Sequence, residues 1–252
     1  MGRRRKRVSE GDLCYEVLPQ RTLGSLVLPR EVEDACKELI EEQQQIRLLR
    51  GHNLEPRHRV LLTGPSGNGK SAFAEALATE LMLPLLVARY EAVAADYWGE
   101  TAARLARLFH AVQARQAVLL LDNWGSGAGW DSGGGSPLLR VDTVPSHVVV
   151  VVATNRPGLL SGSVWRRFQL RFHLPPPTPE QTEAWFEERL GVKVGLSELA
   201  KTEGLASFAD LEALVVDVRR RDVLVPANLG LDALVAERID RWLRRRHLGV
   251  TS

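Results

Sequence analysis

Residues 64–71 read "GPSGNGKS", a spacing of glycine, lysine and serine that can hold the phosphates of a nucleotide. The glycines let backbone N–H groups wrap around phosphate oxygens, and a helix that begins here adds partial positive charge. In such a loop Lys70 bridges the β- and γ-phosphates, and the Ser71 hydroxyl ligates Mg²⁺. The motif therefore predicts ATP and Mg²⁺ as ligands, bound by Gly64, Pro65, Ser66, Gly67, Asn68, Gly69, Lys70, Ser71 and Ala72.

Two polar residues follow apolar runs further along the chain. Asp122 ends "AVLLLD", where a carboxylate beside a phosphate loop serves as a metal ligand, so Ser71 and Asp122 are the predicted Mg²⁺ ligands. Asn155 ends "VVATN", and its amide is suited to orient water or to contact the γ-phosphate. Asparagine before Arg-Pro is also typical of a turn. The phosphate loop and Asp122 together favour the functional interpretation.

The residue after Asp122 is Asn123, at the place where one large class of ATP-hydrolysing enzymes has a glutamate that activates water. An amide can hydrogen-bond the attacking water, but it cannot accept a proton from it. Asn123 is therefore a catalytic position without a base, and we expect the chain to bind ATP and to hydrolyse it very slowly. Whether the chain is an ATPase enzyme stays open at this point.

Strand-like and helical stretches alternate from 59 to 174, and this alternation predicts an α/β fold. One helical stretch, 100–114, carries Leu105, Leu108, Phe109 and Val112 on one face. Strands separated by helices imply a parallel sheet with helices on both faces. We expect five parallel strands, over 59–64, 83–88, 117–121, 147–154 and 168–174.

Three segments are predicted along the chain. Residues 1–20 form a basic, poorly ordered arm, residues 21–176 form the α/β domain, and residues 177–252 form a small all-helical domain. The boundary lies in "PPPTPEQ" (175–181), where prolines end the last strand. The second half of this segment predicts the start of a helix, because it has an N-cap threonine, a first-turn proline and a capping-box glutamine.

The composition, with 44% hydrophobic and 25% charged residues, is typical of a soluble globular protein. The longest apolar run, 147–153, is too short to span a bilayer, and no signal peptide follows the basic N-terminus. Two lone cysteines, Cys14 and Cys36, favour a reducing compartment, so we expect a cytoplasmic protein.

The run "RRRKR" (3–7) can hold phosphates of nucleic acid or anionic lipid, but it is also typical of a solvated tail.

Residues 125–137 read "GSGAGWDSGGGSP", and nearly half of them are glycine. Such a composition disfavours packed structure and predicts a flexible loop.

The chain resembles the AAA+ ATPases, and more narrowly their AAA clade, over roughly residues 20–245. The resemblance is carried by "LLTGPSGNGKS", "ATNRP", "VWRRF" and "GLASFADLE". It implies that 64–71 is the Walker A motif, that Asp122 belongs to Walker B, and that Asn155 is sensor 1. Arg166 and Arg167 match the family's arginine fingers, which reach the nucleotide of a neighbouring subunit; without the resemblance they would be interpreted as surface charges. The last motif belongs to the family's helical lid, which makes 177–252 a lid domain.

Two features depart from the family pattern. Asn123 replaces the family's catalytic glutamate, and the glycine-rich stretch replaces a helix that normally separates Walker B from the sensor 1 strand. The family's second pore loop and part of its subunit contact come from that region. Both departures argue against an active motor.

The stretch "ADYWGETAARL" (95–105) resembles the family's first pore loop, in which an aromatic ring grips the peptide backbone of a substrate. By spacing that ring belongs to Tyr97, with Trp98 beside it, and aromatic rings offer broad, sequence-tolerant contact. A pair of core aromatic residues explains these two positions equally well.

The resemblance implies a ring-type homo-oligomer, such as a hexamer, that remodels or unfolds a protein substrate or delivers it to a separate partner protease. Asn123 leaves open a second hypothesis, an ATP-gated scaffold that binds without turnover. A third hypothesis is a nucleic-acid-associated regulator, and only the "RRRKR" arm supports it. No membrane partner is expected.

Overall fold

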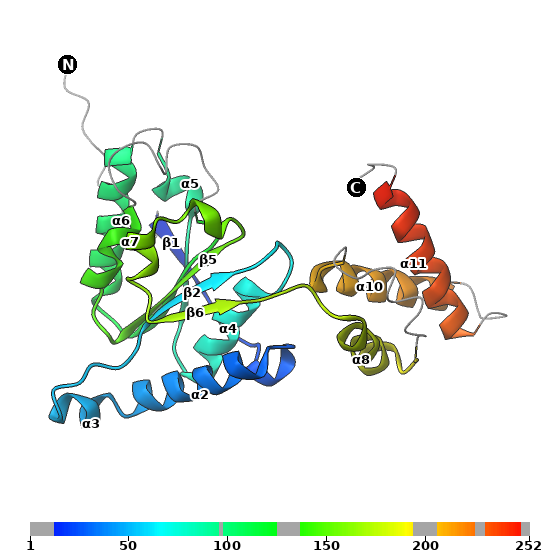
Figure 1. The fold of residues 1–252 in the computed structure, drawn as a ribbon, viewed down its shortest axis with the longest axis horizontal. Coiled ribbons are helices and arrows are strands. Elements are labelled where there is room, and N and C mark those ends of the chain that lie inside the picture. Colours follow the sequence, from blue (N-terminus) through cyan, green and yellow to red (C-terminus); the bar gives the residue numbers. More distant parts are fainter. Residues whose placement is uncertain (1–12, 96–97, 125–136, 194–205, 225–229, 248–252) are drawn as a thin grey trace, which may run out of the picture. The chain divides into compact units, whose positions relative to one another are not determined.

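The computed structural model describes residues 13–95, 98–124, 137–193, 206–224 and 230–247 (Figure 1). The chain divides into two compact units. The first comprises Met1–Gly64 and Lys70–Leu174, and the second comprises Pro65–Gly69 and Pro175–Ser252. Within the described ranges, no helix combines the length and the apolar character that crossing a membrane requires.

The first unit is built on a six-stranded sheet with the strand order β1-β3-β4-β5-β2-β6. The five strands from β2 to β6 are parallel, as expected, and β1 pairs antiparallel with β3 at one end of the sheet. The strands are β1 (Cys14–Val17), β2 (Arg59–Thr63), β3 (Leu85–Ala88), β4 (Ala117–Leu121), β5 (Val148–Thr154) and β6 (Leu170–His173).

Every residue of β5 is buried, and its side chains alternate between the two faces of the sheet. Val148 and Val150 belong to one hydrophobic core, and Val149 and Val151 belong to the core on the other face. Because both faces of the sheet are apolar, helices cover both of them (Figure 1). One face carries α2 (Arg30–Gln44) and α4 (Lys70–Glu80); the other carries α5 (Tyr90–Val93), α6 (Trp98–Val112), η2 (Pro137–Thr143) and α7 (Gly162–Trp165).

β1 adds a sixth, antiparallel strand to the five expected parallel strands, and it lies within residues 1–20, the range that the sequence predicts as an arm. Residues 14–17 form a strand because their backbone pairs with β3 and because Cys14, like Leu13 before it, is buried in the core. The exposed Tyr15 and Glu16 conceal this strand in the sequence. Residues 1–12, which include the "RRRKR" run, lie outside the described residues.

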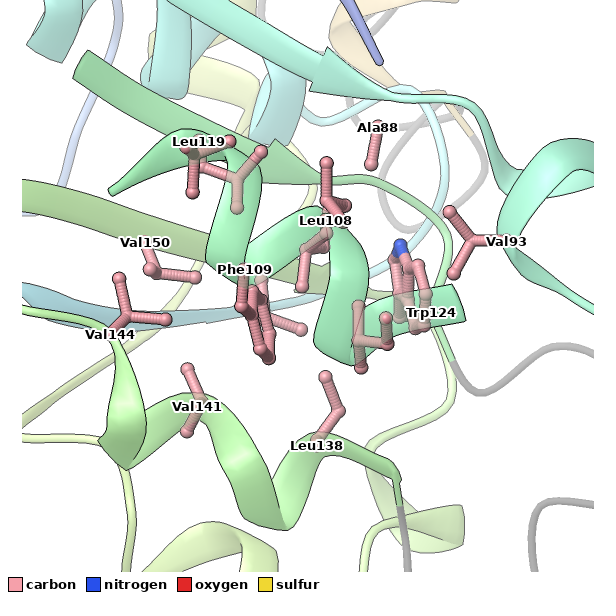
Figure 2. Close-up of a cluster of buried hydrophobic side chains, with 14 of the residues drawn as sticks. Ala88, Val93, Leu108, Phe109, Leu119, Trp124, Leu138, Val141, Val144 and Val150 are labelled. Atoms are coloured by element: carbon pink, nitrogen blue, oxygen red, sulfur yellow. The ribbon is translucent and has the colours of Figure 1, made fainter. Parts of the chain in front are cut away.

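η2 follows the glycine-rich stretch and packs against α6. Its Leu138 and Val141 are buried in the same core as Leu108 and Phe109 (Figure 2). A short 3-10 helix therefore closes the core in the region where the family's helix was expected to be missing. Most of the predicted flexible loop, 125–136, lies outside the described residues.

The second unit has its own hydrophobic core, which includes Phe186, Leu211 and Val235. Its first helix begins at the expected capping box: Thr178 Oγ1 accepts the Gln181 N–H at 3.2 Å, and Gln181 Oε1 accepts the Thr178 N–H at 2.9 Å. The described helices of this unit are α8 (Pro179–Leu190), α10 (Phe208–Leu224) and α11 (Leu231–His247). The chain is thus an α/β unit followed by helices, as the sequence predicts.

Candidate functional site

Lys70 is the first residue of α4, and its side chain is buried. Its Nζ donates a hydrogen bond to the Gly64 carbonyl at 2.9 Å. Burial lowers the pKa of the Lys70 ammonium, and the Asp122 carboxylate acts in the opposite direction. A phosphate group beside Lys70 would favour the charged form further, because an opposite charge stabilises an ammonium.

Ser71 and Asp122 lie together, as the motif spacing predicts. The Ser71 hydroxyl donates to Asp122 Oδ2 at 2.5 Å, and Asp122 Oδ1 accepts the Asn123 backbone N–H at 2.8 Å. A hydroxyl and a carboxylate are oxygen ligands of the kind that Mg²⁺ prefers. No cluster of three or more His, Cys, Asp or Glu side chains suited to a metal ion occurs among the described residues. The donor set therefore fits Mg²⁺ that takes further ligands from phosphate and water.

Gly64 directly follows β2 and has a conformation that suits glycine, with φ +141°. A Cβ atom at this position would lie 2.2 Å from the Leu174 carbonyl oxygen, which is closer than real Cβ contacts allow. A side chain here would therefore force β2 and the end of β6 apart. Gly67 and Gly69 also have positive φ, of 80° and 79°, which explains why glycine recurs in this loop.

Residues 65–69 contact the start of α10 within the second unit. The Ala209 N–H donates to the Gly67 carbonyl at 3.1 Å, and the Phe208 N–H donates to Asn68 Oδ1 at 3.3 Å. The Asn68 side chain is 4% exposed. The sequence motif predicts Asn68 only as a residue of the phosphate loop and does not indicate its contact with α10. The signal for that contact was the motif "GLASFADLE", which contains both partner residues.

Asn155 follows β5, which lies between β4 and β2 in the sheet. The register pairs Leu121 with Val152 and Thr63 with Thr154. Asp122, Asn155 and Gly64 therefore follow the carboxyl ends of three adjacent strands, the edge at which parallel sheets bind ligands. Asn155 is exposed at this edge.

Asn123 is exposed and has φ +56°, in the left-handed region. The residue after it, Trp124, is completely buried, and its backbone N–H donates to the Ala153 carbonyl at 3.0 Å. The sequence predicted neither this turn nor the burial of Trp124. Asparagine is one of the few residues that tolerate positive φ, and that tolerance was the available signal.

Arg166 and Arg167 lie between α7 and β6, close to the start of β2. The Gln169 N–H donates to the Arg59 carbonyl at 3.1 Å, and Arg59 Nε donates to the Arg167 carbonyl at 2.7 Å. The Arg167 guanidinium forms an ion pair with Asp142 of η2, whereas Arg166 is exposed. The arginine pair thus lies at the amino ends of the strands, whereas Asp122 and Gly64 lie at the carboxyl ends. The two ends are separated by one strand length, roughly 16 Å for five residues.

The proposed pore-loop residue Tyr97 lies outside the described residues, and Trp98 begins α6 without a described side chain. Two hydrogen bonds with α6 side chains hold the residues that precede Tyr97. Thr101 Oγ1 accepts the Ala95 N–H at 2.9 Å, and Arg104 Nη1 donates to the Ala92 carbonyl at 3.0 Å.

Residues 60–176 match the family model for the "ATPase family associated with various cellular activities (AAA)". An uncharacterized AAA family ATPase of Sinorhizobium fredii is 29% identical over 167 residues, which are 62% of this chain and 51% of that protein. The ATP-dependent zinc metalloprotease FtsH 1 of Symbiobacterium thermophilum is 30% identical over 207 residues, which are 73% of this chain and 35% of that protein. The chain spans about half or less of the length of these relatives.

A solved structure, the AAA domain of FIGL-1, superposes with a TM-score of 0.67 at 21% sequence identity. The match covers 93% of this chain and 86% of that one. At this identity the comparison establishes the fold, and the sheet with its helical second unit agrees with it.

Proposed function

The chain belongs to the AAA ATPase family, and from this premise we propose that it binds Mg-ATP through residues 64–72 and assembles with copies of itself when ATP is bound. One observation carries the proposal: Ser71 Oγ lies 2.5 Å from Asp122 Oδ2, next to Lys70 at the start of α4. This arrangement combines a phosphate-binding lysine with two oxygen ligands for Mg²⁺. When bound, Mg²⁺ would neutralise phosphate charge, and Ser71 and Asp122 would hold it.

Replacing Lys70 with alanine is expected to abolish nucleotide binding, because Lys70 is the only lysine in residues 64–72 that could bind the phosphates. In the unaltered protein, ATP at about a hundred times its Kd should stabilise the fold by roughly 2.7 kcal/mol. Melting curves with and without Mg-ATP measure this effect. Lys37→Ala, at an exposed lysine paired with Asp34 on α2, is the matched control and should keep the full shift. An unaltered protein that shows no shift would refute the nucleotide assignment.

Self-association is proposed because the two candidate halves of a hydrolysis site lie at opposite edges of one sheet. Arg166 and Arg167 precede β6, at the amino ends of the strands, whereas Asp122 follows the carboxyl end of β4. One chain cannot bring both edges to the same phosphate across roughly 16 Å of strand. Head-to-tail contact between copies would bring them together, and such contacts close into rings when the rotation closes.

Alanine at both Arg166 and Arg167 is expected to weaken ATP-dependent assembly by about tenfold or more, because charge-assisted contacts to phosphate are among the stronger polar contacts. Light scattering with and without Mg-ATP reports the mass of the assembly. Arg47→Ala removes an exposed arginine of α3 (Ile46–Gly51) and serves as the control. If the double variant assembles like the unaltered protein, the trans-acting role is wrong for this pair.

Asn123 supports slow turnover, so an ATP-gated scaffold is the form of this function that we favour over a rapid motor. Remodelling of a protein substrate by a hexamer, and delivery to a separate protease, remain proposals that rest on the family resemblance. We also propose a reducing, cytoplasmic setting, because the sequence has only two cysteines, Cys14 and Cys36, and both are buried. Burial raises the pKa of the Cys36 thiol to about 12, and Glu33 adds to that shift.

A further inference from the structure

Asn123 has a left-handed backbone with φ +56°. Within the described ranges, the other non-glycine residues with positive φ are Asn53 and Met82. For most L-residues this conformation is unfavourable, because Cβ approaches the following carbonyl oxygen; asparagine tolerates it better than most. The position where the AAA resemblance implies a glutamate is therefore a turn that favours glycine or asparagine over most other residues.

The turn changes the face of the sheet on which the next side chain lies. Leu121 and Trp124 are three residues apart, so a strand that continued straight would place them on opposite faces. Both belong to the same hydrophobic core, and both are fully buried. The Trp124 ring also packs edge-on against Tyr90, with ring centroids 6.0 Å apart. Figure 2 shows Trp124 among side chains of this core. The left-handed residue is what brings Trp124 to this side.

Two hydrogen bonds hold the Asp122 carboxylate, one from this turn and one from Ser71 of α4. Asp122 Oδ1 accepts the backbone N–H of Asn123 at 2.8 Å, and Oδ2 accepts the Ser71 hydroxyl at 2.5 Å. The Asn123 N–H lies in the planar peptide unit between Asp122 and Asn123. Leu121 is held in β4 and the Trp124 N–H bonds the Ala153 carbonyl, so both ends of the turn are fixed, and a change of φ at Asn123 must be compensated by rotation of that peptide plane. A change of that backbone would therefore rotate the carboxylate away from Ser71.

We propose that Asn123 is a positioning residue that acts through its left-handed backbone to aim the Asp122 carboxylate at the Mg²⁺ site. This inference rests on the proposed function, since it assigns Asp122 to the Mg²⁺ of Mg-ATP. It gives Asn123 a role that a catalytic glutamate at this position would not fill. The backbone conformation, rather than the carboxamide, carries the role.

Glycine and alanine separate the two explanations, because both remove the carboxamide and only glycine accepts positive φ freely. The measurement is ATP affinity with and without Mg²⁺, using calorimetry on the full chain. Asn123→Gly should keep the Mg²⁺-dependent gain in affinity within about twofold of the unaltered protein. In Asn123→Ala and Asn123→Glu, the Mg²⁺-dependent gain in ATP affinity should be about tenfold smaller than in the unaltered protein, a change of about 1.4 kcal/mol.

Asn53→Ala is the matched control, since Asn53 is exposed and has φ +59°. It should lower the melting temperature and leave the Mg²⁺-dependent gain unchanged. The inference is wrong if Asn123→Ala keeps the gain, or if Asn123→Gly loses it as alanine does. A protein that binds no ATP at all would overturn the proposed function instead. In that case the melting temperatures still decide the turn, because Asn123→Gly must then be more stable than Asn123→Ala.

Discussion

Phosphate release from saturating Mg-ATP is expected to be slow in this protein, close to the background of Lys70→Ala. A positioned general base contributes about 10² to 10⁴ in rate, which corresponds to roughly 3–5 kcal/mol of barrier. Asn123 cannot accept the proton, so this contribution is missing. In the proposed site, Lys70, Asp122 and Asn155 would still bind and orient the phosphates, the metal and water, so a small residual turnover is expected.

The measurement is the steady rate of phosphate release at saturating Mg-ATP, with Lys70→Ala as the control for background hydrolysis. Rapid release by the unaltered protein, lost in Lys70→Ala, would show that another group acts as the base. Asn123→Glu is expected to recover less than a hundredfold. The left-handed backbone disfavours glutamate by about 1–2 kcal/mol, so the turn is expected to shift and to place the new carboxylate imperfectly against the attacking water. Recovery of a thousandfold or more would contradict the turn described here.

Trp124→Ala is expected to lower the free energy of unfolding by about 3–5 kcal/mol. The side chain is fully buried in the core formed by α5, α6, η2 and the sheet, and alanine would leave a cavity there (Figure 2). Because domains are typically stable by only about 5–15 kcal/mol, this loss is a large fraction of the total. Urea denaturation followed by circular dichroism measures it.

Trp165→Ala is the matched control for Trp124, since Trp165 packs against the same core and is only partly buried. Its substitution should cost clearly less than that of Trp124. If the two variants lost the same free energy of unfolding, the complete burial of Trp124 would add no stability beyond that of a partly buried tryptophan.

The parallel strands and the phosphate loop were predictable because each depends on local sequence. β5 reads as an unbroken apolar run since it is buried on both faces, and Lys70 and Ser71 are fixed by motif spacing. β1 was not predictable, because Tyr15 and Glu16 face solvent and the strand exists only through its pairing with β3.

The turn at Asn123 and the contacts of Asn68 were hidden for another reason. A positive φ leaves no periodic pattern, and the burial of Trp124 depends on η2, which lies beyond a glycine-rich stretch. Asn68 contacts Phe208, a residue far away in the chain, through a side-chain oxygen. Both features depend on tertiary contacts that spacing along the chain does not encode.

β1 also has a consequence for how the protein behaves in a crowded solution. Without it, β3 would present a row of backbone donors and acceptors along an apolar strand, which is a template for strand pairing between molecules. β1 pairs with these backbone groups, and the new edge strand of the sheet is short and lies beside charged side chains. Glu16 pairs with Arg115 at 2.8 Å, and the Arg89 guanidinium lies 5.2 Å from the centre of the Tyr15 ring. The segment before the α/β core therefore protects the sheet against aggregation.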